Sequence, residues 1–310
     1  MSKIAIVGCG LVGGSWAVVF ARAGYEVALY DPFPTSMDAT MSLARNAVED
    51  LARQDLLDGA RPAELLARLA PCGSLASALE GALYVQESAP ERLEVKKALY
   101  AEMDGLAGPA TILASSTSGL PISTFTEEIA SRARCVVSHP INPPHLVPLV
   151  EIVPAPWTAP ATVAATEALM REVGQTPIQL RHEIDGFVVN RLQSAVLAEA
   201  FRLVEDGVAS VADIDAAMSD GLGLRWSFMG PFETIDLNAK GGVRDYCDKL
   251  GAMYWGLARQ LADPRQWGEE LVREVEAQCR SRLSIGDLKD RQLWRDQCLA
   301  KLTAFKRTRL

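Results

Sequence analysis

Four side chains in the sequence have the types that a proton-transfer site requires. His139 lies in the proline-rich run Ser138–Pro144, with Glu151 12 positions further on and Asn190 51 positions further on. An imidazole accepts a proton near neutral pH, and a carboxylate can orient it through its other ring nitrogen. A single histidine beside a turn is more often structural. Together with the hydroxyl of Ser118, this set favours general-base catalysis.

The N-terminal residues predict an element that binds a dinucleotide. Residues 3 to 7 form a short apolar strand that leads into a glycine-rich turn, and from Ser15 the apolar pattern becomes helical. Glycines at this spacing permit a tight turn, backbone access to a pyrophosphate and close helix–strand packing. An ordinary glycine-rich turn is the alternative. We predict cofactor contacts at Gly8, Gly10, Leu11, Val12 and Gly13.

The choice of cofactor follows from the end of the second predicted strand. That strand covers residues 26 to 30, and Asp31 follows it, 18 residues after Gly13. A carboxylate at this position accepts hydrogen bonds from the ribose hydroxyls and repels a 2′-phosphate. The sequence therefore favours NAD over NADP.

The order of the predicted elements indicates an α/β fold followed by an all-α domain. Residues 35–70 read as a helical excursion of two helices, broken near 58–62, and further strands are expected at 84–87, 112–115, 136–139, 149–153 and 175–180. After residue 186 only helical patterns occur, at 190–206, 211–218, 243–259 and 267–281. We predict a Rossmann-type, mostly parallel sheet in an NAD-binding domain at 1–184 and a helical domain at 185–310.

Composition narrows the range of partners. The formal net charge is −8 at pH 7, and nucleic acids or anionic membranes bind basic surfaces, so we expect neither as a partner. No apolar run approaches the roughly 20 residues of a transmembrane helix. The six cysteines are scattered without metal-ligand spacing, which predicts no metal site and suits a cytoplasmic location.

Three tracts together resemble the 3-hydroxyacyl-CoA dehydrogenase family: Ser115–Gly119, Ser138–Pro144 and Gly186–Arg191. Within that family, Asn190–Gln193 and Asp220–Glu233 are similar to the lambda-crystallin branch, which includes L-gulonate 3-dehydrogenases. The resemblance spans nearly the whole chain. It implies NAD-dependent oxidation of a CH–OH group.

The resemblance also assigns roles to single residues. It implies that His139 is the general base, that Glu151 orients it, and that Ser118 and Asn190 donate hydrogen bonds to the substrate oxygen. Asn142 would contact the nicotinamide ribose. The remaining two positions, Glu91 and Lys96, would lie on the nicotinamide side of the cofactor, although an exposed helix with a charge pair explains them equally well.

The sequence departs from the family pattern at two places, and both affect the expected substrate. The helical excursion of the acyl-CoA-specific relatives carries lysines that help hold coenzyme A, and here residues 35–70 contain none. Arg225 lies among glycines and apolar residues, where it either extends to solvent or binds a substrate carboxylate. We expect a small free 3-hydroxy acid of the L-gulonate type. Short-chain 3-hydroxyacyl-CoA or carnitine oxidation remains an alternative, as does a non-catalytic, crystallin-like NAD-binding role.

The helical half also predicts self-association. The helix that begins near Asn190 carries apolar residues on more than one face, among them Val188, Leu192, Val196 and Leu203. A helix of this kind is buried either in its own core or against a partner chain. We expect a homodimer through the helical domain.

Overall fold

An eight-stranded sheet organises the first part of the computed structural model, which describes residues 2–262 and 264–309. The strand order is β3-β2-β1-β4-β5-β6-β7-β8, and every neighbouring pair is parallel except β6 and β7. The Rossmann-type, mostly parallel sheet predicted from the sequence is confirmed. The strands are β1 (Lys3–Val7), β2 (Glu26–Tyr30), β3 (Leu69–Pro71), β4 (Ala82–Glu87), β5 (Ile112–Ser115), β6 (Cys135–Pro140), β7 (Leu149–Pro154) and β8 (Thr176–Gln179).

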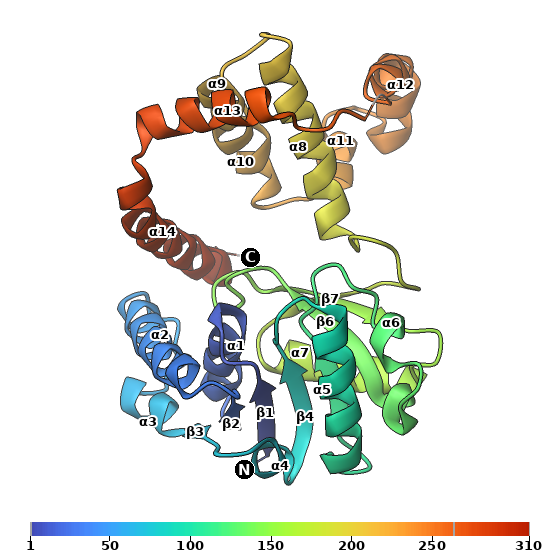
Figure 1. Cartoon of the computed structure of the whole chain (residues 1–310). Helices are drawn as coiled ribbons and strands as arrows, with labels where there is room; N and C mark the ends of the chain where they lie inside the picture. Colours follow the sequence, from blue (N-terminus) through green and yellow to red (C-terminus); the bar gives the residue numbers. More distant parts are fainter. Residues whose placement is uncertain (1, 263, 310) are drawn as a thin grey trace. The chain divides into compact units, whose positions relative to one another are not determined.

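Helices cover both faces of this sheet, because the buried strand β1 presents alternate side chains to two separate apolar clusters. Ile4 and Ile6 pack into the cluster that includes Trp16 of α1, whereas Ala5 and Val7 pack into the one that includes Tyr100 of α5. Figure 1 shows α1 and α2 together on one side of β1 and α5 alongside β4. The helices are α1 (Leu11–Arg22), α2 (Pro34–Arg53), α3 (Pro62–Ala67), α4 (Leu75–Leu79), α5 (Leu93–Leu106), α6 (Ser123–Thr126) and α7 (Pro160–Glu172), with a 3₁₀ helix at Ala130–Arg134.

The helical excursion is present as α2 and α3. α2 ends at Arg53 and α3 begins at Pro62, so the break starts before the expected position near 58–62 and includes most of it. Three residues in the break, Asp55, Asp58 and Gly59, have positive φ angles. The sequence pattern did not indicate β3, which follows α3 directly and pairs with β2 at the edge of the sheet.

The chain divides into two compact units, residues 1–191 with 292–310 and residues 192–291. The second unit is helical, as the predicted all-α part requires, and includes a π-helical segment at Ala217–Leu222 that the sequence did not indicate. Its helices are most of α8 (Val189–Glu205), α9 (Val211–Ala216), α10 (Gly223–Trp226), α11 (Pro231–Leu237), α12 (Gly242–Gln260), α13 (Glu269–Arg282), a 3₁₀ helix at Ile285–Asp287 and the start of α14 (Leu288–Arg309).

The C-terminal residues belong to the first unit. Ala300 of α14 is 1% exposed and lies in the same apolar cluster as Trp16. The expected boundary between residues 184 and 185 remains a prediction. Among the described residues, no helix has the length and apolar character that crossing a membrane requires.

Candidate active site

A histidine and a glutamate face each other at the end of two antiparallel strands. His139 of β6 and Glu151 of β7 are direct partners in the register, so both side chains leave the sheet on the same face. The Nδ1 atom of His139 lies 2.7 Å from Oε2 of Glu151. Both side chains are buried. The pair predicted from a spacing of 12 residues is therefore formed by strand pairing.

The second oxygen of Glu151 meets the start of α8. Oε1 accepts hydrogen bonds from the backbone N–H groups of Val188 at 2.8 Å and Val189 at 3.1 Å. Burial raises the pKa of this carboxyl, but the hydrogen bonds to His139 and to the two N–H groups outweigh it and hold the pKa below its ordinary 4.5. Glu151 is therefore ionised at neutral pH and holds the imidazole through Nδ1, which leaves Nε2 to act as a base.

An unusual backbone turn brings α8 to Glu151. Gly186 and Phe187 both have positive φ angles, 73° and 51°. A phenylalanine rarely adopts this conformation, and such residues cluster at functional sites. The Phe187 side chain is completely buried, and its ring centroid lies 5.5 Å from that of His139. The buried Phe187 side chain thus anchors the turn and packs beside the His139 ring.

Asn190 and Ser118 are brought together although they are far apart in the chain. Nδ2 of Asn190, in the first turn of α8, donates a hydrogen bond to the backbone oxygen of Ser118 at 2.7 Å. Ser118 follows β5 and is exposed. Since parallel strands end at the same edge of the sheet, the ends of β5 and β6 place Ser118 on the edge where His139 lies.

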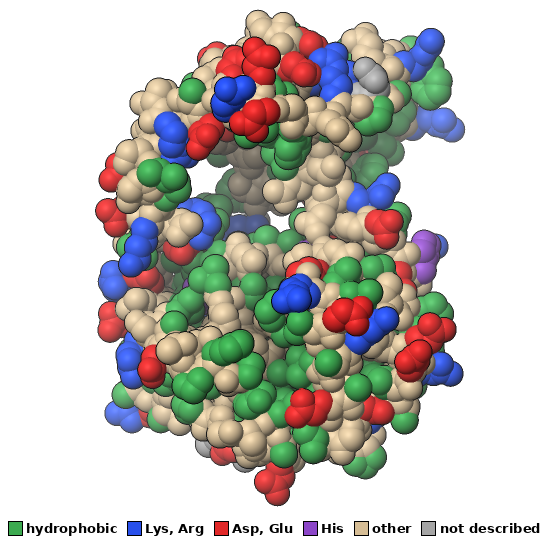
Figure 2. Space-filling view, viewed as in Figure 1, with side chains coloured by type: hydrophobic (Ala, Val, Ile, Leu, Met, Phe, Trp, Pro, Cys, Tyr) green, Lys and Arg blue, Asp and Glu red, His purple; other side chains and the backbone are tan. Residues whose placement is uncertain are grey.

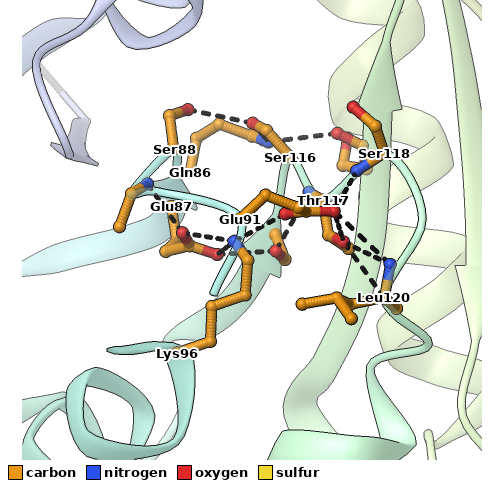
Figure 3. A network of polar contacts seen from close by, with 12 residues as sticks. Gln86, Glu87, Ser88, Glu91, Lys96, Ser116, Thr117, Ser118 and Leu120 are labelled. Carbon is orange, nitrogen blue, oxygen red and sulfur yellow. Dashed lines mark hydrogen bonds and ion pairs between the residues drawn. The ribbon is translucent and has the colours of Figure 1, made fainter. Parts of the chain in front are cut away.

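Glu91 organises the turn that carries Ser118, as Figure 3 shows. Its Oε1 atom accepts hydrogen bonds from Thr117 Oγ1 at 2.6 Å, Ser118 N at 2.9 Å and Gly119 N at 3.0 Å. Burial raises the pKa of Glu91, but the bond from Thr117, the charge of Lys96 and the backbone donors together lower it. Glu91 therefore holds the Ser118 turn in place, and its position on the nicotinamide side of the cofactor stays a prediction.

Lys96 is buried beneath this turn rather than exposed. Its Nζ atom bonds to both oxygens of Glu87 at 2.8 and 3.0 Å and lies 3.5 Å from Glu91. Ser115 Oγ donates to Glu87 at 2.6 Å. Neither Glu87 nor Ser115 is among the site residues predicted from the sequence. The sequence feature that could have indicated them is a carboxylate at the end of one apolar strand and a hydroxyl at the end of the next, which the pairing of β4 with β5 places opposite each other.

The glycine-rich turn fits a dinucleotide. A Cβ atom at Gly13 would lie 2.0 Å from the oxygen of Gly8, and one at Gly8 would lie 2.6 Å from the backbone of Ser88 at the end of β4. Gly10 is different, since a Cβ atom there would meet no atom within 4 Å. No side chain caps the N-terminus of α1, which begins at Leu11, so the N–H groups of its first turn are available to phosphate oxygens.

Asp31 is tied to the same turn. Its carboxylate accepts hydrogen bonds from Cys9 N at 2.8 Å and Phe33 N at 2.9 Å. A cavity of about 410 Å³ lies beside it, and the described residues that line it include two carboxylates, Asp31 and Asp38, and no basic side chain. This environment suits ribose hydroxyls and disfavours a 2′-phosphate.

The two remaining predicted residues lie at the surface. Asn142 is exposed just after β6, three residues from His139. Arg225 is exposed on the short helix α10 of the second unit, immediately after the π-helical segment. The ion pairs described in that unit engage other cations, among them Lys249, Arg273 and Arg282.

Comparison with known proteins agrees with this arrangement. A family model of the NAD-binding domain of 3-hydroxyacyl-CoA dehydrogenase matches residues 3–184, and one of its C-terminal domain matches residues 186–278. The lambda-crystallin homolog of Bos taurus is 47% identical over 313 residues, which cover 98% of this chain and 95% of that protein. L-carnitine dehydrogenase of Streptomyces coelicolor is 39% identical over 278 residues, covering 89% of this chain and 86% of that one.

A solved structure of a relative extends the likeness to the whole chain. The NAD+-dependent dismutase 5-formyl-3-hydroxy-2-methylpyridine 4-carboxylic acid 5-dehydrogenase superposes with a TM-score of 0.83 at 29% identity. The match covers 99% of this chain and 98% of that one.

Proposed function

Because the chain belongs to the 3-hydroxyacyl-CoA dehydrogenase family, whose N-terminal domain binds NAD, we propose that it oxidises the 3-hydroxyl of a small free 3-hydroxy acid, of the L-gulonate kind, to the 3-keto acid. The observation that carries the reaction type is the buried His139–Glu151 pair. Over the same 98% of this chain, the lambda-crystallin homolog of Bos taurus is 47% identical and the 3-hydroxyacyl-CoA dehydrogenase of Gibberella moniliformis is 38% identical, which supports the lambda-crystallin branch.

His139 would act as the general base. With Glu151 ionised, Nδ1 carries the ring proton and Nε2 presents its lone pair to the substrate hydroxyl. As the proton moves to Nε2, the ring becomes positively charged, and Glu151 stabilises that charge without moving. NAD+, when bound at the glycine-rich turn, supplies the hydride acceptor.

Ser118 and Asn190 would stabilise the substrate oxygen. The Asn190 carboxamide is held by the Ser118 carbonyl, and the Ser118 hydroxyl is exposed on the turn that Glu91 fixes. Donors held in place before the reaction stabilise negative charge that develops on oxygen as hydride departs. We assign both residues to this role.

The helical excursion supports a free acid rather than a coenzyme A thioester. Residues 35–70 contain no lysine, and three of their four arginines, all but Arg45, are engaged locally. Arg53 lies 3.0 Å from Asp50, Arg61 pairs with Glu64, and Arg68 donates to the Ala21 carbonyl at 2.7 Å. Few cations therefore remain there for the phosphates of coenzyme A.

Arg225 would bind the substrate carboxylate. Its guanidinium is exposed, and its planar fork suits bidentate pairing with a carboxylate. Loss of a hydrogen bond to a charged group costs about 1.5 to 3 kcal/mol. We therefore expect Arg225→Met to lower kcat/KM for L-gulonate by about tenfold to over a hundredfold, and to leave NAD affinity nearly unchanged.

The matched control is Arg244→Met, which removes another exposed arginine of the same unit. Both variants and the wild type are compared by initial rates of NADH formation. Equal kcat/KM values for Arg225→Met and the control would contradict the proposal that Arg225 binds the substrate carboxylate.

Carnitine is the second candidate substrate. It is also a 3-hydroxy acid, and the L-carnitine dehydrogenase relative is 39% identical to this chain. A quaternary ammonium group binds aromatic faces, and the partly exposed Trp226 adjoins Arg225. A panel of L-gulonate, 3-hydroxybutyrate and carnitine separates these substrates. A purely structural, crystallin-like role would give no turnover with any of them.

We also propose a homodimer formed through the helical unit. Large apolar side chains are exposed on α12, among them Trp255 at 69%, and Figure 2 shows hydrophobic side chains at the surface where α12 lies. Leu192 of α8 is also exposed. Exposed large apolar side chains that cluster on one surface are typical of a protein interface.

A further inference from the structure

A second cavity lies on the first unit, among parts of the chain that the catalytic proposal does not use. Its volume is about 370 Å³, and it is lined by the end of α1, residues 144–148, residues 174–176 and the last turns of α14. It contains neither His139, Glu151 nor any residue of the glycine-rich turn.

The lining of this cavity is basic, although the chain as a whole is acidic. Arg22, Lys306 and Arg307 contribute three positive charges. One carboxylate, that of Asp58, accompanies them: it bonds to Arg307 Nη1 at 2.9 Å and lies 3.7 Å from Arg22 Nε. In a protein with a net charge of −8, this is a local excess of positive charge.

The two guanidinium groups converge on one point. Gly174 has a φ of 79°, and a Cβ atom built on it would lie 3.7 Å from Arg307 Nη2 and 3.8 Å from Arg22 Nη2. The Arg22 side chain is only 4% exposed. Burial lowers its pKa to about 10, and the charge of Arg307 adds to that effect. Asp58 bridges the pair at Arg22 Nε and Arg307 Nη1, whereas the Nη2 atoms of both arginines lie beside Gly174, where a second anion can pair with them.

Polar groups without a protein partner complete the lining. Gln175 is 6% exposed and lines the cavity, and neither its Oε1 atom nor Nδ1 of His145 has a hydrogen-bond partner among the described residues. Burial, together with Arg22, lowers the pKa of His145 to about 4, so its ring is neutral at pH 7. A neutral imidazole and a carboxamide bind hydroxyl groups rather than a second charge.

This cavity is separate from the dinucleotide site. The pyrophosphate would lie at the N-terminus of α1, at Leu11, whereas Arg22 ends that helix. The two ends are about 16 Å apart, since an α-helix rises 1.5 Å per residue. One dinucleotide phosphate therefore does not reach both places.

We propose that this cavity binds the phosphate group of a small phosphate monoester, with Arg22 and Arg307 pairing with its oxygens, Lys306 adding charge, and Gln175 and His145 facing the rest of the molecule. A volume of about 370 Å³ exceeds what a phosphate ion alone requires and falls in the range of small-molecule sites.

The test uses the full chain saturated with NAD, so that the nucleotide site is already filled. Glycerol 3-phosphate and inorganic phosphate are titrated separately by calorimetry at constant ionic strength set with sodium chloride. We expect saturable binding of glycerol 3-phosphate at one site per chain. Equal affinity for inorganic phosphate would identify the free ion as the ligand of the same site, and weaker affinity would identify the ester.

The double variant Lys306→Gln/Arg307→Gln changes only exposed side chains, so it should fold even if Arg22 variants do not. We expect it to weaken glycerol 3-phosphate binding at least about tenfold, with NAD affinity unchanged. Lys301→Gln, on the same helix but outside this cavity, is the matched control and should bind as the wild type does. No saturable binding by the wild type, or equal binding by the double variant, would overturn the proposal.

Discussion

Glu151 has two partners at once, and both are fixed by the backbone. Strand pairing places it opposite His139, and the left-handed turn at Phe187 brings the first N–H groups of α8 to its other oxygen. A helix N-terminus stabilises negative charge. The residue that orients the base is therefore also the anchor of the helix that carries Asn190.

This double role predicts a pH dependence of stability. The folded-state pKa of Glu151 lies below 4.5, so its contribution is fully present above that pH and is lost as the pH falls through the lowered value. Glu151→Gln should lower the free energy of unfolding in urea at pH 7 by about 1.5 to 3 kcal/mol. As the pH falls further below 4.5, the difference between variant and wild type should shrink.

A matched control is Glu49→Gln, since the Glu49 side chain is 66% exposed and lies 4.0 Å from Arg53. Its curve of unfolding free energy against pH should run close to that of the wild type. A gap between Glu151→Gln and the wild type that stays constant from pH 7 to well below 4.5 would contradict the anchoring role.

The sequence predicts His139, Glu151, Ser118 and Asn190 as site residues, and the structure brings them together in two pairs, while their catalytic roles stay predictions. The sequence does not predict Glu87 as a site residue, because a carboxylate within a strand pattern usually indicates an exposed position. Only the pairing of β4 with β5, and the return of α5, show that Lys96 covers it.

At the level of elements, two glycines in the turn between β1 and α1 are needed for different physical reasons. Gly13 is required by packing against Gly8, whereas the space beside Gly10 is open on the protein side. We expect Gly10→Ala to fold with a loss of about 1 kcal/mol or less, as for other N-cap changes, and to bind NAD at least about tenfold more weakly. Its methyl group would occupy the approach of the pyrophosphate.

Gly13→Ala is the contrasting variant. Its Cβ atom would lie 2.0 Å from the Gly8 oxygen, so it should lose about 1 to 3 kcal/mol of unfolding free energy or more. Urea unfolding and fluorescence titration with NAD measure the two effects separately. Wild-type NAD affinity in Gly10→Ala would contradict the assigned path of the cofactor.

The elements that the sequence pattern did not reveal were hidden for a common physical reason. β3 is three residues long and joins the sheet only through β2, and the π-helical segment before Arg225 differs from an α-helix by hydrogen-bond register alone. The return of α14 to the first unit depends on contacts such as Ala300 with the core. None of these leaves a periodic signal, whereas α2, α8 and α12 do.

At the scale of the whole molecule, the helical unit exposes several large apolar side chains, among them Phe232 at 78% and Trp255 at 69%, and contiguous patches of such side chains mark interfaces. We expect a homodimer in sedimentation equilibrium and expect Trp255→Glu on α12 to shift it toward the monomer, because a charge would have to be buried in the interface. Gln260→Glu, which adds a charge to the same helix about 140° around its axis from Trp255, is the matched control and should remain dimeric. A wild-type monomer at micromolar concentration would refute the proposed assembly.

The central claim joins a reaction, oxidation with His139 as the base, to a substrate class, free 3-hydroxy acids. The most direct test compares initial rates of NADH formation from L-gulonate and from 3-hydroxybutyryl-CoA, using the wild type and His139→Ala. The account predicts a higher kcat/KM for the free acid, and a kcat that falls by about two to four orders of magnitude in His139→Ala while NAD affinity is retained. A preference for the thioester, or a His139→Ala variant that keeps most of its turnover, would contradict it.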